Sequence, residues 1–278
     1  MKAERSIALT IGLGLALLLC VPPDDVFAQR GRGGWDPYEP PARDIYPSNT
    51  FTFCRIEYTS KWGWGRRGGR WRTDYPDSDL NFSERLSELT TIAVNRTRDG
   101  RVEHVVVRLE DEDLYHYPFI YMIEVGDLDL ANAEADRLRD YLLRGGFLMV
   151  DDFWGEDEWQ NWEMEFAKVF PPEEYPMFEI PLSHPIYNCV FPVHEAPQIP
   201  SIHAWLNSGE TFERWDGQKP HYWGVNDKDG RLMAVICHNT DLGDGWERES
   251  ENHQYFEEFS VKKAYPMGIN IVVYAMTH

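Results

Sequence analysis

Two acidic residues directly follow a short apolar run and are the first candidates for chemistry. Residues 147–150 read Phe-Leu-Met-Val. This run is apolar on both faces, which is typical of a central parallel strand. Asp151 and Asp152 come next. Ligands of open α/β sheets bind outside the carboxyl ends of the strands, so we expect these carboxylates at a binding edge. A purely structural role, as a helix cap or in a turn, is the alternative.

Two further segments are predicted to bring acids and histidines to the same edge. The loop at 238–247 follows a predicted strand and carries Asp241, Trp246 and Glu247. The other segment holds His184, which precedes a proline and is equally compatible with a simple turn. Converging carboxylates and imidazoles can hold a divalent cation or act as an acid and a base.

Three functional interpretations remain open. The first is a binding module for a small molecule, a glycan or a protein of the cell envelope. The arginines would neutralise the acids in a ligand site formed by Arg55, Arg72, Asp151, Asp152, His184, Asp241 and Trp246.

Another interpretation is a structural interaction protein of the cell envelope. It predicts that substitutions in the pocket change stability only.

The second interpretation is a metal-assisted hydrolase, with carbohydrate-related substrates among the candidates. A divalent cation would lower the pKa of a bound water, and Glu247 would serve as the base. The candidate metal ligands are Asp151, Asp152, His184 and Asp241.

Several familiar catalytic signatures are absent from the sequence. There is no G-x-S-x-G or G-x-C-x-G nucleophile elbow, no phosphate-binding glycine loop with lysine, and no C-x-x-C pair. The acids of the loop at 238–247 have the wrong spacing for an EF-hand, and Gly243 stands where a ligand would be needed.

Composition narrows the class of partner. The chain has 278 residues, with 27 Lys and Arg against 47 Asp and Glu, and a net charge of -20. This excess of acid argues against a nucleic-acid partner or an anionic membrane surface, because both bind basic faces.

The N-terminus predicts export to the periplasm or the medium. A basic start precedes the apolar residues 6–21, and predicted cleavage after Ala28 makes residues 1–28 a signal peptide. A lipoprotein anchored at Cys20 is less consistent, because Leu19 is large for the position before a lipid-accepting cysteine. No later segment is long and apolar enough to cross a membrane.

The mature chain is predicted to have two parts. Residues 29–49 are rich in Gly, Pro and Arg and form a flexible segment, whereas 50–278 form a single domain. Cleavage of the signal leaves Cys54, Cys189 and Cys237, and the sequence does not say whether two of them pair.

Predicted strands and helices alternate along this domain. The strands are expected at 51–58, 102–109, 118–125, 147–150, 177–180 and 232–237. The helices are expected at 82–93 after a cap at Asn81 or Ser83, at 131–144, at 156–170, and near the C-terminus with a kink or late start at Pro266. This alternation predicts a three-layer α/β sandwich with a mostly parallel central sheet.

Several motifs also resemble a known family. They include Phe53-x-Arg55-x-x-Tyr58, Gly145-Gly146-Phe147-Leu148-x-Val150-Asp151-Asp152, His184-Pro185-Ile186-Tyr187 and Asn239-x-Asp241-x-Gly243-x-x-Trp246-Glu247. From about Phe51 to the end, the chain resembles the uncharacterised bacterial family called domain of unknown function 4159. The family is similar in fold to class I glutamine amidotransferases, so the resemblance implies a flavodoxin-like sandwich. Amidotransfer is not implied, because the cysteine in a glycine elbow is missing here.

Overall fold

The structure is a computed structural model, and it describes residues 50–61 and 69–278. The predicted signal peptide and the Gly/Pro/Arg-rich segment 29–49 lie outside the described residues, as does Cys20. None of the helices in the described part of the chain is both long and apolar enough to span a bilayer.

In the described residues, seven strands form one mixed, mostly parallel sheet in the order β2-β1-β3-β4-β7-β6-β5. Their bounds are β1 Phe53–Glu57, β2 His104–Arg108, β3 Phe119–Ile123, β4 Phe147–Asp151, β5 Phe178–Glu179, β6 His221–Asn226 and β7 Leu232–His238. Each neighbouring pair from β2 to β7 is parallel, and β6 runs antiparallel to both of its neighbours. β4 was predicted to be central, and it is the fourth strand of the seven, buried at every residue.

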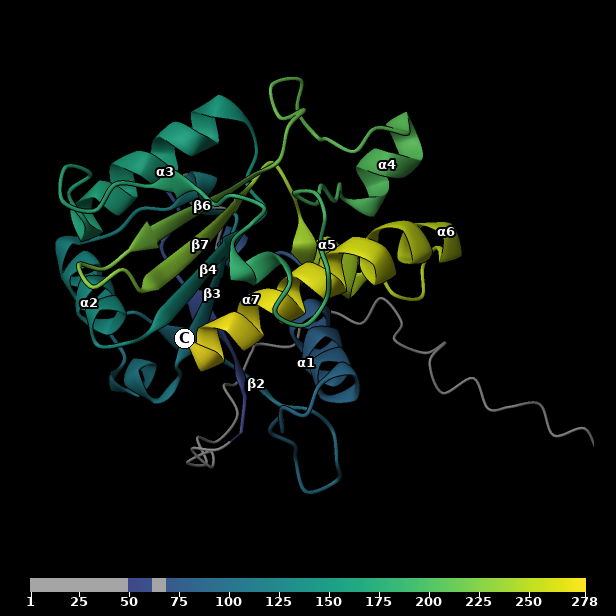
Figure 1. Ribbon diagram of the computed structural model, residues 1–278, viewed down its shortest axis with the longest axis horizontal. Helices are drawn as coiled ribbons and strands as arrows, with labels where there is room; N and C mark the ends of the chain where they lie inside the picture. The colour runs from purple at the N-terminus through teal and green to yellow at the C-terminus, as the bar shows by residue number, and fades with distance from the viewer. Residues whose placement is uncertain (1–49, 62–68) are drawn as a thin grey trace, which may run out of the picture. The chain divides into compact units, whose positions relative to one another are not determined.

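Helices cover both faces of the sheet. They are α1 Asp77–Leu89, α2 Asn132–Leu143, α3 Gly155–Val169, α4 Ile202–Ser208, α5 Leu242–Glu247, α6 His253–Tyr255 and α7 Tyr265–Thr277. Figure 1 shows α2 and α3 on one side of the sheet, and α1, α5 and α7 on the other.

Alternation along the strands builds two cores. In β1, Phe53 belongs to the core that includes α1, α5 and α7, whereas its neighbour Cys54 belongs to the core that includes α2 and α3. Successive side chains of a strand point to opposite faces, so a strand that is apolar throughout can feed both cores. The predicted three layers are therefore present in the described residues.

Several boundaries differ from the sequence-based expectation. α1 begins at Asp77, so Asn81 lies inside the helix and caps nothing; its side chain donates to the carbonyl of Trp246 at 2.9 Å. β3 ends at Ile123, because Glu124 adopts a left-handed conformation with φ of 58°. The strand β6 was not predicted from the sequence.

The C-terminal segment forms one helical run. The π-helical segment Phe256–Ala264 continues directly into α7, with Pro266 in the first turn of α7. The expected kink or late start is replaced by this π segment, in which the Tyr265 amide reaches back to Ser260. π-helical turns are rare and occur mostly as single-turn bulges inside α-helices.

The three cysteines in the described residues form no disulfide. Cys54, Cys189 and Cys237 are all free, and Cys54 and Cys237 are buried. Burial raises the pKa of both buried thiols well above the usual range, which makes them poor nucleophiles.

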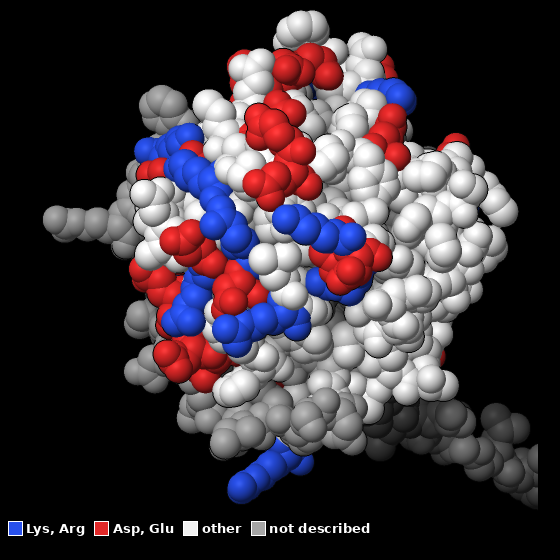
Figure 2. Space-filling view, turned by 60° about the vertical axis from the view of Figure 1, so that its left-hand side comes forward, with Lys and Arg blue, Asp and Glu red and all other residues white. Residues whose placement is uncertain are grey.

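Charged side chains on the outer surface are mixed in sign. On the face that Figure 2 shows, basic and acidic groups lie beside one another over one half, and the other half carries few charges. Exposed residues of opposite charge also pair with one another, as Arg144 does with Asp140 at 2.8 Å. The net negative charge therefore does not form one continuous acidic field on this face.

A fully buried ion pair joins β1 to α1. Arg55 of β1 is fully buried and pairs with Asp79 of α1, its Nη2 lying 2.6 Å from Oδ1. Its Nη1 donates to the carbonyls of Trp71 and Thr73, and its Nη2 donates to Ser78 Oγ. Arg55 therefore ties the segment after β1 to α1, and its donors are directed at these core partners.

Substituting Arg55→Leu tests this anchor. We expect unfolding to become easier by about 3–5 kcal/mol, because a buried carboxylate and two carbonyls lose their donors. Urea unfolding followed by circular dichroism measures the change. Arg108→Leu is the matched control: this half-exposed side chain lies 3.7 Å from Glu57, and its loss is expected to cost less than about 1 kcal/mol. Equal effects of the two substitutions would contradict the anchoring role.

Candidate functional site

A cavity of about 250 Å³ opens at the carboxyl ends of the parallel strands. Its walls come from the loops that follow β1, β3, β4 and β7, and from the segment 201–214. β2 and β3 lie on opposite sides of β1, so the strand order reverses there and the loops diverge. Open α/β sheets characteristically bind ligands at such a reversal.

Acidic residues dominate the lining. The acids are Asp74, Glu124, Asp152, Glu158, Glu213, Asp241 and Asp244. The basic or titratable nitrogen groups are Arg70, His203, Arg214 and Arg248. Carboxylates thus outnumber guanidinium groups in a space of limited size, and the electrostatics of the cavity depend on what balances them.

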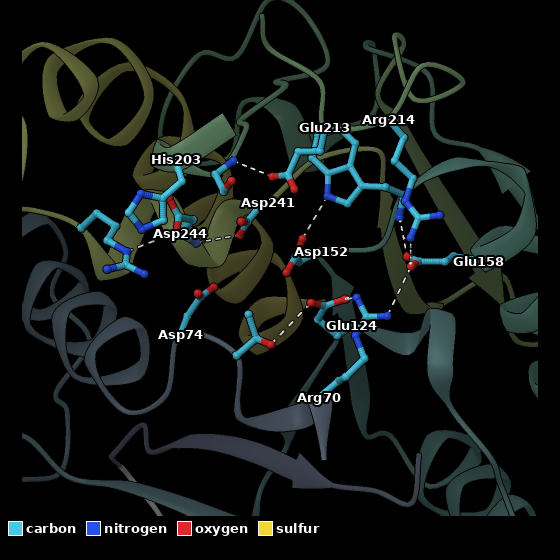
Figure 3. Close-up of a pocket in the computed structure, with 14 residues that line it drawn as sticks. Arg70, Asp74, Glu124, Asp152, Glu158, His203, Glu213, Arg214, Asp241 and Asp244 are labelled. Atoms are coloured by element: carbon cyan, nitrogen blue, oxygen red, sulfur yellow. Dashed lines mark hydrogen bonds and ion pairs between the residues drawn. The ribbon is translucent and has the colours of Figure 1, made fainter. Parts of the chain in front are cut away.

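Three aspartates converge on one point. One carboxylate oxygen each of Asp74, Asp152 and Asp241 lies within 4.8 Å of the other two, and Figure 3 shows these side chains pointing toward a common space. They come from the segment before α1, the end of β4 and the N-cap of α5. Oxygen atoms in such an arrangement are the ligands that hard divalent cations prefer.

Asp74 is the least compensated member of the group. Its side chain is 9% exposed, and no hydrogen-bond donor contacts its Oδ2 among the described residues. A Cβ at Gly243 would lie 2.5 Å from this oxygen, so the glycine permits the close approach of α5. A buried carboxylate without a donor is costly unless a proton or a cation balances it.

The other two aspartates each use one oxygen locally. Asp152 Oδ1 accepts from Trp154 Nε1 at 3.0 Å, and Asp241 Oδ1 accepts from the Asp244 amide at 2.7 Å. Within the described ranges, neither forms an ion pair with Lys or Arg, and Asp74 forms none either.

Burial is the main cause of perturbed titration in this group. It raises the pKa of Asp74, Asp152 and Asp241 well above the usual value of a carboxyl, and repulsion from neighbouring carboxylates adds to the effect. Without a bound cation, protons are therefore retained in the group at pH values where ordinary carboxyls are ionised.

The opposite wall is a network of paired charges. Arg70 pairs with Glu124 and lies 3.4 Å from Glu158, and Arg214 contacts Glu158 at 2.5 Å, as the dashed lines in Figure 3 mark. Burial raises the pKa of Glu124 to about 7, although Arg70 opposes the shift. This carboxyl is suited to exchange a proton near neutral pH.

Left-handed backbone conformations concentrate around the cavity. The non-glycine residues with positive φ in the described ranges are Asp74, Glu124, Asp152 and Asn239. Three of them line the cavity, and Asn239 Oδ1 accepts from the Gly155 amide at the start of α3. Such conformations cost about 1–3 kcal/mol and are commonly retained at functional sites.

The predicted pair Asp151-Asp152 separates. Asp152 enters the cavity, whereas Asp151 lies beneath it and accepts from the Tyr121 hydroxyl at 2.9 Å and the Gly243 amide at 3.0 Å. β4 ends at Asp151, and Asp152 adopts a left-handed conformation with φ of 51°, so this local turn sends the two side chains in different directions. Asp151 thus fixes the start of α5, and its burial raises its pKa to about 7.

The remaining predicted residues do not line the cavity. His184 packs against the ring of Tyr274, and its Nδ1 accepts from the Ile186 amide, so it closes a turn. The proposed ligand set of Asp151, Asp152, His184 and Asp241 is therefore not assembled, because the turn at His184 is held by α7. Arg55 is buried behind the sheet edge, and its pairing with Asp79 replaces the expected contact with the cavity acids.

Arg72, Trp246 and Glu247 are also displaced from their expected positions. Arg72 lies over the rings of Trp71 and Tyr75, and Trp246 is fully buried against Phe82. Glu247 lies beside the cavity, where its Oε2 is 2.6 Å from Arg248 Nε.

Sequence reasoning missed several cavity residues. Glu124 follows an apolar strand in the same way as Asp151, but the strand was extended across it. Asp74 carries no comparable signal, because its segment lacks periodicity and is placed by tertiary contacts. The other missed residues are Arg70, Glu158, His203, Glu213, Arg214 and Arg248, whereas Asp244 belongs to the loop at 238–247 that was expected at this edge.

Comparison with known proteins identifies a family relation. The family model described as Domain of unknown function (DUF4159) matches residues 52–276, which is most of the chain. No curated protein matches the chain.

The raised pKa of Asp152 gives a stability prediction with a defined sign. A folded carboxyl whose pKa is raised keeps its proton after the unfolded chain has lost it, so its contribution to stability is lost as pH rises above about 4. Asp152→Asn removes this penalty and keeps an acceptor for Trp154. We expect the metal-free variant to be more stable than the wild type by about 1–2 kcal/mol at pH 8, and not at pH 4.

Urea unfolding in a chelator at the two pH values measures this difference. Asp140→Asn is the control of opposite sign, because hydrogen bonds from Tyr115 and Arg144 lower the pKa of this exposed carboxyl. That control is expected to lose stability at pH 8. A wild type that is more stable than Asp152→Asn at pH 8 without metal would refute the prediction.

Proposed function

This chain belongs to the DUF4159 family, and we propose that it is an exported binding module whose cavity holds a hard divalent cation. The cation would link the protein to a small polar ligand that enters the cavity. One observation carries the proposal: the buried, donor-free carboxylate of Asp74 converges with Asp152 and Asp241. Export rests on the basic and apolar pattern of residues 1–28.

The donor set favours Mg²⁺, Ca²⁺ or Mn²⁺ among common cations. All three residues offer carboxylate oxygens, and neither His nor Cys belongs to the group. Softer metals such as zinc are usually held by nitrogen and sulfur ligands. A divalent cation would replace the protons that the raised pKa values retain, and would relieve the repulsion among the three aspartates.

The site is held in a shape that suits binding. Asp241 is fixed as the N-cap of α5, and Gly243 allows α5 to approach Asp74. The left-handed conformations of Asp74 and Asp152 direct both side chains toward the same space. Backbone strain and repulsion among the carboxylates are present before a cation binds. A cation that binds the folded chain would stabilise the folded state by mass action.

We also propose that the fold is flavodoxin-like, of the class I glutamine amidotransferase type. The strand order β2-β1-β3-β4-β7 of the parallel part supports this assignment, because it follows the 2-1-3-4-5 order of flavodoxin-like sheets. The amidotransferase reaction is not proposed, since the sequence has no cysteine in a glycine elbow.

Asp74→Asn tests the cation site. Asparagine tolerates left-handed φ, so the fold is expected to survive. Titration of the metal-free mature chain with CaCl₂ and MnCl₂ in a calorimeter at pH 7.5 is expected to show binding. In the variant, the affinity for the cation is expected to fall at least about 100-fold. Asp74 would be a direct ligand, and its loss should cost more than the loss of a residue that only hydrogen-bonds to a ligand.

Glu213→Gln is the matched control, because Glu213 lines the same cavity and lies outside the group of three. Its affinity is expected to stay within about threefold of the wild type, since its charge is removed without loss of a ligand. No binding of either ion by the wild type, or equal losses in both variants, would overturn the proposal.

Metal-assisted hydrolysis is the second candidate function, and Glu124 favours it. Its carboxyl lines the cavity with a pKa of about 7, so at neutral pH it can accept a proton from a water polarised by the cation. This residue takes the role that sequence reasoning assigned to Glu247.

Glu124→Gln tests the hydrolase reading with p-nitrophenyl phosphate and p-nitrophenyl acetate as probes in the presence of Mn²⁺. We expect kcat to fall about 10²–10⁴-fold while Mn²⁺ affinity is kept, because only the base is removed. Glu247→Gln, compared under the same conditions, shows which of the two carboxyls acts. Absence of hydrolysis of both probes by the wild type would end this candidate.

A further inference from the structure

The cavity contains a second acidic group that shares Asp74 with the first, and we propose that it holds a second divalent cation. One oxygen each of Asp74, Asp244 and Glu247 lies within 4.8 Å of the other two. The inference rests on the proposed function, because the same aspartate serves both groups. It changes the site from one metal ion to a pair bridged by a carboxylate.

The placement of the second group follows from α5. Asp244 and Glu247 are three residues apart on this helix, so they lie on one face. Asp74 approaches that face across Gly243, which has no side chain to block it. A carboxylate has two oxygens, and Asp74 can therefore offer one to each cation.

An unpartnered buried oxygen distinguishes this group from an ordinary acidic cluster. Asp74 Oδ2 is buried and has no hydrogen-bond donor in the described part of the chain. The other two carboxylates have partners: Asp244 Oδ2 accepts from the Ile202 amide at 2.7 Å and the Tyr255 hydroxyl at 3.1 Å, and Glu247 Oε2 lies 2.6 Å from Arg248 Nε. The group thus combines two positioned ligands with one that lacks a donor.

Arg248 compensates this group only in part. Its Nε lies 2.6 Å from Glu247 Oε2 and 3.3 Å from Asp244 Oδ1, while its Nη1 turns away to Glu251 at 2.8 Å. One guanidinium therefore faces the three carboxylates of the second group, and the first group has no ion pair within the described ranges.

Charge balance favours two cations over one. The two groups together contain five carboxylates, since Asp74 is common to both, and Arg248 supplies one positive charge. Four negative charges remain when all five are ionised. Two divalent ions balance this charge, whereas one would leave half of it in a buried site.

A pair of cations would also define how the ligand is held. Two-metal sites place the ions about 3.5–4 Å apart and clamp oxygen atoms of the ligand between them. The ligand class implied is one that presents an oxygen-bearing group to both ions.

Stoichiometry tests the second site directly. Equilibrium dialysis of the metal-free mature chain against MnCl₂ at pH 7.5, with metal counted by elemental mass spectrometry, is expected to give two equivalents. Electron paramagnetic resonance of the same sample is expected to show an exchange-coupled Mn²⁺ pair rather than isolated ions.

Three substitutions separate the sites. Asp152→Asn is expected to retain only the second equivalent, Glu247→Gln only the first, and Asp74→Asn neither. Asp140→Asn, as the control at an exposed carboxyl outside the cavity lining, is expected to keep two equivalents and the coupled signal. Circular dichroism of each variant confirms that the fold is retained before metal is counted.

The outcomes distinguish the two proposals. No bound Mn²⁺ in the wild type would overturn both. One equivalent that Asp152→Asn abolishes and Glu247→Gln leaves intact would overturn the second site and leave the proposed function standing. Two equivalents without coupling, of which Asp74→Asn removes only one, would overturn the shared ligand.

Discussion

Repulsion among buried carboxylates at one end of the sheet is the constraint on which the rest of this site depends. Asp74, Asp152 and Asp241 are brought together although burial and mutual repulsion raise the pKa of each. Folding alone would favour separating such groups or exposing them to water. They stay together because the surrounding structure determines their positions: Asp241 caps α5, and Trp154 donates to Asp152.

The segment that carries Asp74 is held in place by Arg55, a buried residue that does not line the cavity. Arg55 donates to the carbonyls of Trp71 and Thr73, which immediately precede Asp74, and pairs with Asp79 in the first turns of α1. The segment that carries the least compensated carboxylate is therefore clamped to β1 and α1 at once. The buried ion pair of Arg55 and Asp79 thus helps to fix the shape of the cavity without lining it. The stability of the core and the shape of the site are therefore coupled.

Sequence patterns predicted the layers and part of the site for physical reasons that also explain the misses. The apolar run 147–150 and the amphipathic helix 156–170 carry their own periodicity, and the rule for strand ends located Asp152 and Asp241. The same rule could not tell Asp152 from Asp151, because the local turn decides which of two neighbours faces the cavity. Asp74 and His184 were misjudged because tertiary contacts place them: Arg55 holds the segment of one, and Tyr274 of α7 packs against the other.

Protons and cations compete for the same carboxylate oxygens in this cavity. This competition makes cation binding depend on the pH of the medium. Burial raises the pKa of Asp74 and Asp241, so they hold protons more firmly than ordinary carboxyls; a cation that binds must compete with these protons, and its apparent affinity falls as the medium becomes more acidic. The opposite wall differs, because Arg70 and Arg214 already pair with Glu124 and Glu158. A ligand would therefore meet two different walls, one whose carboxylates need a bound ion for compensation and one whose carboxylates are paired by the protein itself.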